Sequence, residues 1–281
     1  RMAKMVRTFV SGPGRAQLWD GLAKTEDDFA FSLGARKRFA KAWFAEVDAI
    51  VTERRVKGPG GGDMLDLLIA ARDPETNEAF SDEQLGDQVS TMILAGHETT
   101  ATALFWSLYL LALDPVTQDE LAMEARSARA SGSFDAAKLT FTRAVIDEAM
   151  RLYPPAFLIV RAAAGPDTVA GFSVAPKDIV LMSPWLLHRH EKLWDQPNAF
   201  KPSRFLPGEP PPDRFAYLPF GVGPRVCIGA QFALTEATLA LAKLIAEFKV
   251  DLLDREPVTP VGVVTTQPDR SPMFAIARRD A

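Results

Sequence analysis

The clearest pattern of hydrophobic and polar positions lies in residues 82–113, a mostly apolar run interrupted by few polar residues. Ser81 and Gln84 fit a capping box at its start, and Pro115 marks its end. The pattern predicts a helix of about thirty residues, or about 45 Å at the usual rise per residue. A helix this long and this apolar should run through the middle of the molecule.

Shorter helices are predicted on both sides of this run. In the first fifty-odd residues, Phe39, Trp43 and Val47 recur at helical spacing, which predicts two or three helices. Further amphipathic helices are predicted over residues 114–128, 141–153 and 229–248.

Short runs of β type appear only after Pro154 and Pro155. They cover residues 157–161, 168–174 and 178–182, and two more runs, 259–266 and 272–279, are expected to close the chain as a hairpin. The predicted class is therefore mainly α with a small, segregated β part.

Composition narrows the classes of function. The chain has 281 residues and a formal net charge of −4, which gives no reason to expect a nucleic-acid partner. A single cysteine excludes an internal disulfide. The most apolar stretch is broken by His97 and Glu98, so no membrane segment is predicted. The chain opens in an amphipathic helical pattern without an initiator Met, and we expect its true N-terminus to lie upstream.

The lone cysteine lies in the segment FGVGPRVCIG, residues 220–229. Glycines let the backbone approach a flat ligand closely, and the start of a following helix favours a thiolate that can bind a metal. Arg225 suits a carboxylate on the same ligand. A cysteine packed in an ordinary turn is the alternative, but the fixed spacing of Phe, Gly, Arg, Cys and Gly favours a ligand site.

The segment AGHETT, residues 95–100, places an acid and hydroxyls within the apolar helix. Such groups are costly there unless they are used. A zinc-protease motif is excluded because residue 101 is Ala, not His. Gly96 and the threonines predict a local bulge that opens a groove, and a kink with satisfied polar groups is the alternative.

The segment EAMR places Glu148 and Arg151 on one helical face, where they can form an ion pair. Arg204, in the irregular segment FKPSRF, is expected to complete a buried cluster with them. Such a cluster would fix the irregular segment to the helices.

Together these segments resemble the cytochrome P-450 family of haem-thiolate monooxygenases, from about residue 20 to the end. FGVGPRVCIG is similar to the haem-binding loop, AGHETT to the oxygen-activating motif of the long helix, and EAMR to the Glu-x-x-Arg motif. FKPSRF resembles the Pro-Glu-Arg-Phe segment, with Ser203 in place of Glu.

The resemblance implies a cytochrome P-450 fold and haem b, with Cys227 as the thiolate ligand of its iron. Arg225 and Arg161 would bind haem propionates, while Glu98 and Thr99 would deliver protons to bound dioxygen. Further haem contacts are expected from Phe220, Gly221, Gly223, Gly229, Ala95 and Gly96, and substrate contacts from Thr91, Leu94, Phe157, Pro272 and Met273.

Family members have helical and sheet segments that would lie ahead of Arg1. The resemblance therefore implies that residues 1–281 are the C-terminal major portion of a single domain, with the long helix at 82–113 and the haem loop at 220–229. We expect the chain alone to bind haem poorly.

The leading hypothesis is hydroxylation or epoxidation of a hydrophobic substrate by dioxygen, with electrons from a ferredoxin or flavoprotein reductase. A peroxide-driven peroxygenase or haem-thiolate isomerase is the first alternative, and the intact Glu98–Thr99 pair argues against it. A non-catalytic remnant that binds no haem is the second. The motifs resemble those of soluble bacterial members, which implies a cytoplasmic protein.

Overall fold

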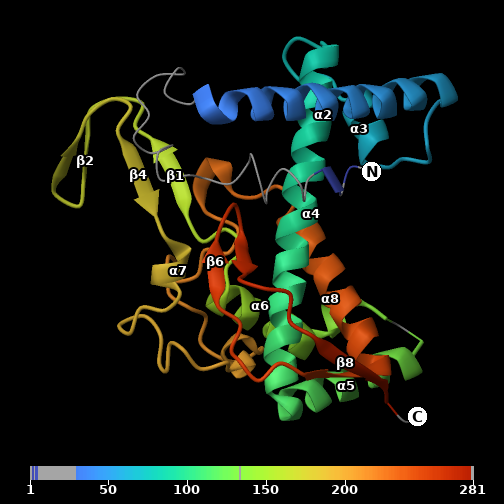
Figure 1. Cartoon of the computed structure of the whole chain (residues 1–281), viewed down its shortest axis with the longest axis vertical. Coiled ribbons are helices and arrows are strands. Elements are labelled where there is room, and N and C mark those ends of the chain that lie inside the picture. The colour runs from blue at the N-terminus through green and yellow to red at the C-terminus, as the bar shows by residue number, and fades with distance from the viewer. Residues whose placement is uncertain (1, 3, 6–29, 133, 280–281) are drawn as a thin grey trace. The chain divides into compact units, whose positions relative to one another are not determined.

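The computed structural model describes residues 2, 4, 5, 30–132 and 134–279. The chain divides into two compact units, Arg1–Glu98 and Thr99–Ala281, and one helix continues through the division (Figure 1). The helices predicted ahead of residue 30 lie outside the residues that are described, apart from isolated positions.

The continuous helix is α4 (Asp82–Leu113), which has the bounds that the sequence predicts. The capping box is confirmed: the Ser81 N–H donates to Gln84 Oε1 at 2.9 Å, and the Gln84 N–H donates to Ser81 Oγ at 3.2 Å. The predicted bulge near Gly96 is wrong, because α4 is α-helical throughout. One helical glycine costs only about 1 kcal/mol relative to alanine, too little to break a ladder supported on both sides.

In the first unit, α2 (Ala30–Lys57) and α3 (Met64–Ala70) pack with the first part of α4 (Figure 1). Trp43 and Val47 of α2 form a buried cluster with Leu85 and Val89 of α4, and Trp43 Nε1 donates to Ser90 Oγ at 3.0 Å. The sequence pattern did not predict α3. Its start is fixed by the Asp63 side chain, which accepts the Asp66 N–H.

In the second unit, the rest of α4 packs with α5 (Pro115–Ala130), α6 (Thr140–Leu152) and α8 (Ala230–Glu247) around the largest apolar cluster. All three helices were predicted within a few residues. Asp114 caps α5 by accepting the Thr117 N–H, and Pro115 follows it as the first helical residue, where a missing N–H costs nothing. The mainly α class is confirmed.

The β part consists of four separate antiparallel pairs in the described chain. They are β1 (Ile159–Ala162) with β4 (Ile179–Met182), β2 (Asp167–Val169) with β3 (Phe172–Val174), β5 (Phe248–Leu252) with β8 (Phe274–Arg278), and β6 (Pro260–Gly262) with β7 (Thr266–Pro268). Short helical turns are α7 (Pro184–Leu187), η3 (Ala136–Lys138), η4 (Pro202–Phe205) and η5 (Gly223–Arg225).

The predicted closing hairpin is wrong. Strand β8 pairs with β5, whose residues follow α8 directly, while β6 turns back on β7 through three intervening residues. The run at 168–174 is itself a hairpin, because Ala170 and Gly171 adopt φ values of 51° and 85° and reverse the chain.

Glu148, Arg151 and Arg204 form the cluster that the sequence predicts. Arg151 Nε donates to Glu148 Oε2 at 2.7 Å with both side chains fully buried, and Arg204 Nε donates to Glu148 Oε1 at 3.3 Å. Arg151 also donates to the carbonyl oxygens of His188, Pro197 and Ala199. The pair therefore fixes the irregular segment, which has no ladder of its own, onto α6.

Arg151→Ala should lower the free energy of unfolding by about 3–5 kcal/mol, because it leaves Glu148 buried without its main partner. Urea unfolding followed by circular dichroism measures the change. Lys249→Ala is the control, since Lys249 pairs with Asp251 at 3.4 Å on the surface and its loss should cost at most about 1 kcal/mol. Equal losses in the two variants would contradict the role given to Arg151.

Candidate functional site

The cysteine loop is a closed turn ahead of α8. The Cys227 N–H donates to the Phe220 carbonyl oxygen at 2.9 Å, and the Val226 N–H donates to the Gly223 carbonyl oxygen at 3.0 Å. Gly221 and Gly223 have φ values of 73° and 79°, which side chains other than glycine rarely adopt. This turn leaves the Cys227 thiol exposed, so a core cysteine, the alternative interpretation of the sequence, is excluded.

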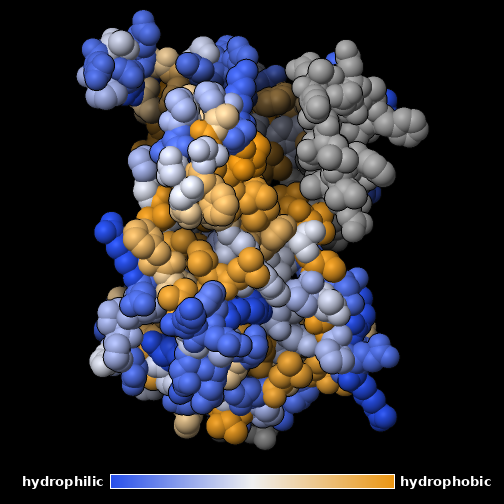
Figure 2. Space-filling model, turned by 90° about the vertical axis from the view of Figure 1, so that its left-hand side faces the viewer, coloured by the Kyte–Doolittle hydropathy of each residue, from blue (hydrophilic) through white to orange (hydrophobic). Residues whose placement is uncertain are grey.

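Exposed apolar residues stand on both sides of Cys227 in the sequence. Val226, Ile228 and Phe232 are exposed, with Ile228 at 86% of its full surface. Exposed apolar residues also lie on the neighbouring strands β1 and β4, among them Val160 and Leu181. Figure 2, which views the side on which β1 and β4 lie in Figure 1, shows hydrophobic side chains gathered in its middle part. A concentration of apolar surface around a thiol suits a flat apolar ligand.

Two arginines lie in or next to the cysteine loop: Arg225 belongs to the loop, and Arg161 belongs to the neighbouring strand β1. Arg225 is exposed and makes no hydrogen bond to a described residue. Arg161 lies on β1 two residues from Ile159, so both side chains are on one face of the strand. An added Cβ at Gly221 would lie 4.0 Å from Ile159 Cδ1, which places the start of the loop against that face. Phe220 packs on the main core at the base of the loop.

The oxygen-motif residues lie on α4 at its division between the units. Ala95 and Gly96 are exposed, while Glu98 and Thr99 are half-buried and both make interactions with other residues. Thr91 is exposed, and its hydroxyl donates to the Asp87 carbonyl oxygen at 2.8 Å. Leu94 is partly buried against the apolar cluster of the first unit, so its side chain contributes to that core.

The predicted substrate residues fall in two places. Phe157 contacts the β6–β7 hairpin, where a Cβ added to Gly262 would lie 2.7 Å from Phe157 Cζ. Pro272 and Met273 belong instead to the connection into β8, and Met273 exchanges hydrogen bonds with Leu253 and the Asp254 carboxylate. Gly262 was missed because a glycine within a short β run carries no ligand chemistry of its own.

Sequence analysis also missed a buried polar network beneath the cysteine loop. His188 Nε2 accepts the Leu218 N–H at 2.8 Å, and its side chain is fully buried. The Tyr217 hydroxyl donates to Asp147 Oδ1 at 3.0 Å. Burial lowers the pKa of His188 to about 4, and the charges of Arg151 and Arg189 act in the same direction. The imidazole is therefore neutral, with its proton on Nδ1.

The cytochrome P450 family model matches residues 29–271. The chain belongs to the cytochrome P450 family. It is 38% identical over 219 residues to cyclooctatin synthase of Streptomyces melanosporofaciens, covering 76% of this chain and 48% of that protein. It is 34% identical over 223 residues to pentalenene oxygenase of Streptomyces avermitilis, covering 78% and 49%.

The fold agrees with this membership. The crystal structure of the cytochrome P450DA heme domain matches with a TM-score of 0.83 and 28% identity, over 99% of this chain and 60% of that one. The chain spans about half the length of the curated relatives it matches. No helix among the described residues is long and apolar enough to cross a membrane.

Membership in the cytochrome P450 family implies a haem cofactor, and the residues of the cysteine loop fit one. A sulfur donor is exposed, its turn carries no bulky side chain at Gly221 or Gly223, and the surface around it is apolar. Arg161 and Arg225 are cations, which suit the carboxylates of a porphyrin.

The stability of this P450 should fall as pH drops from about 6.5 toward 4. The pKa of His188 is about 4 in the folded state against 6.5 unfolded, so in this window only the unfolded chain takes up the proton. The full effect is about 3 kcal/mol. Chemical unfolding at several pH values measures the slope.

His188→Gln should remove that part of the slope, because its amide oxygen can accept the Leu218 N–H without titrating. Comparing the two proteins cancels the opposite contribution of Asp147, whose pKa is raised by burial. Identical slopes for wild type and His188→Gln would show that His188 does not titrate as described.

Gly262→Ala should destabilise the protein by about 1–3 kcal/mol, because the new methyl group overlaps Phe157. Thermal unfolding measures the loss, and adding Phe157→Leu should restore most of it. Gly165→Ala is the matched control, since no atom lies within 4 Å of its added Cβ. If the double variant is less stable than Gly262→Ala, the contact is not the cause.

Proposed function

We propose that this P450 is a monooxygenase that inserts one oxygen atom of dioxygen into a hydrophobic organic molecule. The observation that carries the proposal is the exposed thiol of Cys227, held on a glycine turn three residues ahead of α8. The thiolate is the form of cysteine that binds a metal. Haem b, bound through this sulfur, supplies the activation of dioxygen.

The other residues hold and orient the cofactor. Arg161 and Arg225 would bind the two propionates, since both are cations and a guanidinium group pairs well with a carboxylate. Phe220 packs on the main core at the base of the loop, and with haem bound it would shield one side of the sulfur. Gly221, Gly223 and Gly229 keep the loop thin enough for its backbone to lie against the ring. Ala95 and Gly96, small exposed residues of α4, are proposed as further haem contacts.

Thr99 and Glu98 move protons. The Thr99 hydroxyl holds a proton donor at the reaction site, and the half-buried Glu98 carboxyl takes protons from solvent and passes them on. Both residues lie in the middle of a long helix that is supported on either side, which fixes the hydroxyl in position.

Apolar residues favour a hydrophobic substrate. Phe157, together with the β6–β7 hairpin at Gly262, forms the best-supported wall of its pocket. Thr91, Leu94, Pro272 and Met273 are proposed as further contacts. Relatives named as a pentalenene oxygenase and a cyclooctat-9-en-7-ol 5-monooxygenase support a substrate of this apolar kind. Electrons come from a ferredoxin or flavoprotein reductase in the cytoplasm, docked on the face that carries the cysteine loop.

Cys227→His should abolish the Soret band that marks thiolate ligation in the carbon-monoxide spectrum of the reduced protein, because a neutral nitrogen replaces the sulfur. Arg255→Ala, a change of one charge on an exposed loop, is the control and should leave the band unchanged. An unaltered band in Cys227→His would refute the ligand assignment. A wild-type protein that shows no haem band even after reconstitution with excess haem would support the non-catalytic alternative, because weak binding alone would only lower the band.

Thr99→Ala should uncouple turnover, so that less product forms for each reductant consumed while hydrogen peroxide accumulates. The reason is the loss of a positioned proton donor, worth about 10²–10⁴-fold in rate for general acid catalysis. Product and peroxide yields with a reductase system measure it. Unchanged coupling, with equal product from added peroxide alone, would favour the peroxygenase.

A further inference from the structure

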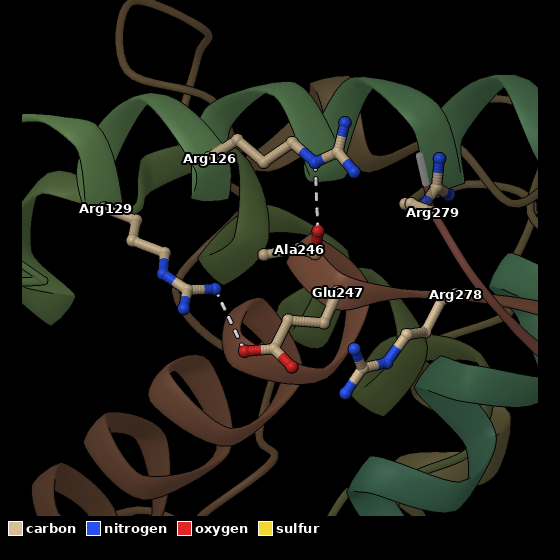
Figure 3. Close-up of a pocket in the computed structure, with 6 residues that line it drawn as sticks. All are labelled: Arg126, Arg129, Ala246, Glu247, Arg278 and Arg279. Atoms are coloured by element: carbon tan, nitrogen blue, oxygen red, sulfur yellow. Dashed lines mark hydrogen bonds and ion pairs between the residues drawn. The ribbon is translucent and has the colours of Figure 1, made fainter. Parts of the chain in front are cut away.

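A cavity of about 500 Å³ lies where α5, the end of α8 and β8 meet (Figure 3). It shares no residue with the candidate haem site. Its lining residues are Arg126, Arg129, Ala246, Glu247, Arg278 and Arg279.

The charge of this cavity is unusual for the chain. Four arginines and one acidic residue, Glu247, line it, and a second carboxylate outside the lining, Asp119, pairs with Arg279; the chain as a whole carries a net charge of −4. Like charges gathered in a hollow raise the potential there and repel one another. Each of the four arginines should therefore have a partner in the fold if the cavity has only a structural role.

Two of them are explained by the fold. Arg126 Nε donates to the Ala246 carbonyl oxygen at 3.0 Å, at the end of α8. Arg279 Nη1 pairs with Asp119 at 2.6 Å, and the Arg279 N–H donates to the Glu247 carbonyl oxygen at 2.8 Å. The carbonyl groups that make a helix C-terminus negative are thus already satisfied at Ala246 and Glu247.

The other two arginines are not required by the fold. Arg129 meets Glu247 at 2.9 Å in an exposed pair, an arrangement that contributes little to stability. The Arg278 side chain is exposed and makes no hydrogen bond or ion pair within the described part of the chain. In Figure 3 the Arg129 and Arg278 side chains are drawn on either side of Glu247. The cavity therefore has more positive charge than its structure needs.

We propose that this cavity binds a small phosphate-bearing anion through Arg278 and Arg129. A guanidinium group presents a planar pair of donors that matches two phosphate oxygens, which a chloride ion cannot use. Ala246 is the only apolar lining residue and no aromatic ring is present, so the site recognises phosphate groups rather than a base or ring. The volume admits a diphosphate. This inference is independent of the proposed monooxygenase activity.

Titration of the full chain with inorganic pyrophosphate, followed by isothermal calorimetry, tests the proposal. Arg278→Ala should weaken binding at least about tenfold, because it removes a charged donor pair. Glu247→Gln should strengthen it several-fold, because it removes the one repelling carboxylate and releases Arg129. Arg255→Ala changes the net charge equally and should bind like wild type. Circular dichroism checks that each variant is folded.

Three results would overturn the proposal. The first is equal affinity of wild type and Arg278→Ala. The second is binding that pyrophosphate, sulfate and chloride share at equal affinity, which would mean only an unspecific response to ionic strength. The third is binding of an acidic peptide such as oligoglutamate without binding of pyrophosphate, which would assign the cavity to a protein partner. Binding of inorganic phosphate and of phosphate esters then distinguishes a free ion from a phosphorylated metabolite.

Discussion

The irregular segment of the second unit, from His188 to Arg204, depends on one buried ion pair, Glu148 with Arg151. Both side chains are fully buried, and Arg151 satisfies its donors with Glu148 and with three backbone carbonyl groups far along the chain. Such a pair need not stabilise the fold relative to apolar residues. It instead specifies one arrangement, because an irregular segment without strands or long helices has no regular ladder to position it.

That arrangement reaches the cysteine loop through a short series of contacts. Arg151 holds the His188 carbonyl oxygen, and the His188 ring accepts the Leu218 N–H, two residues ahead of Phe220. The Phe220 carbonyl oxygen in turn closes the loop on the Cys227 N–H. The thiol is therefore placed by polar contacts that begin on α6, not by the loop alone. In this P450 a continuous series of hydrogen bonds and short backbone segments therefore connects Arg151 of the EAMR motif to Cys227 of the cysteine loop.

Features that depend on residues close together in the sequence, such as the ends of helices, could be predicted. The pairing of strands that lie far apart in the sequence could not. The ends of α4 followed from Ser81, Gln84 and Pro115, because capping depends on residues a few positions apart. The partner of β8 did not follow, because β5 continues directly from α8 and its apolar residues fit the pattern of that helix. His188 was missed for a related reason: its role exists only once Leu218, thirty residues later, has folded back onto it.

The exposed position of Cys227 has a consequence for how the protein behaves in air. Because the chain contains one thiol, intermolecular oxidation can join two copies and no more, so it ends at a covalent dimer rather than a polymer. Each such bond would use the sulfur that we propose as the haem ligand. Under that proposal, cross-linking and cofactor loading compete for the same atom, and a reductant in the buffer decides between them.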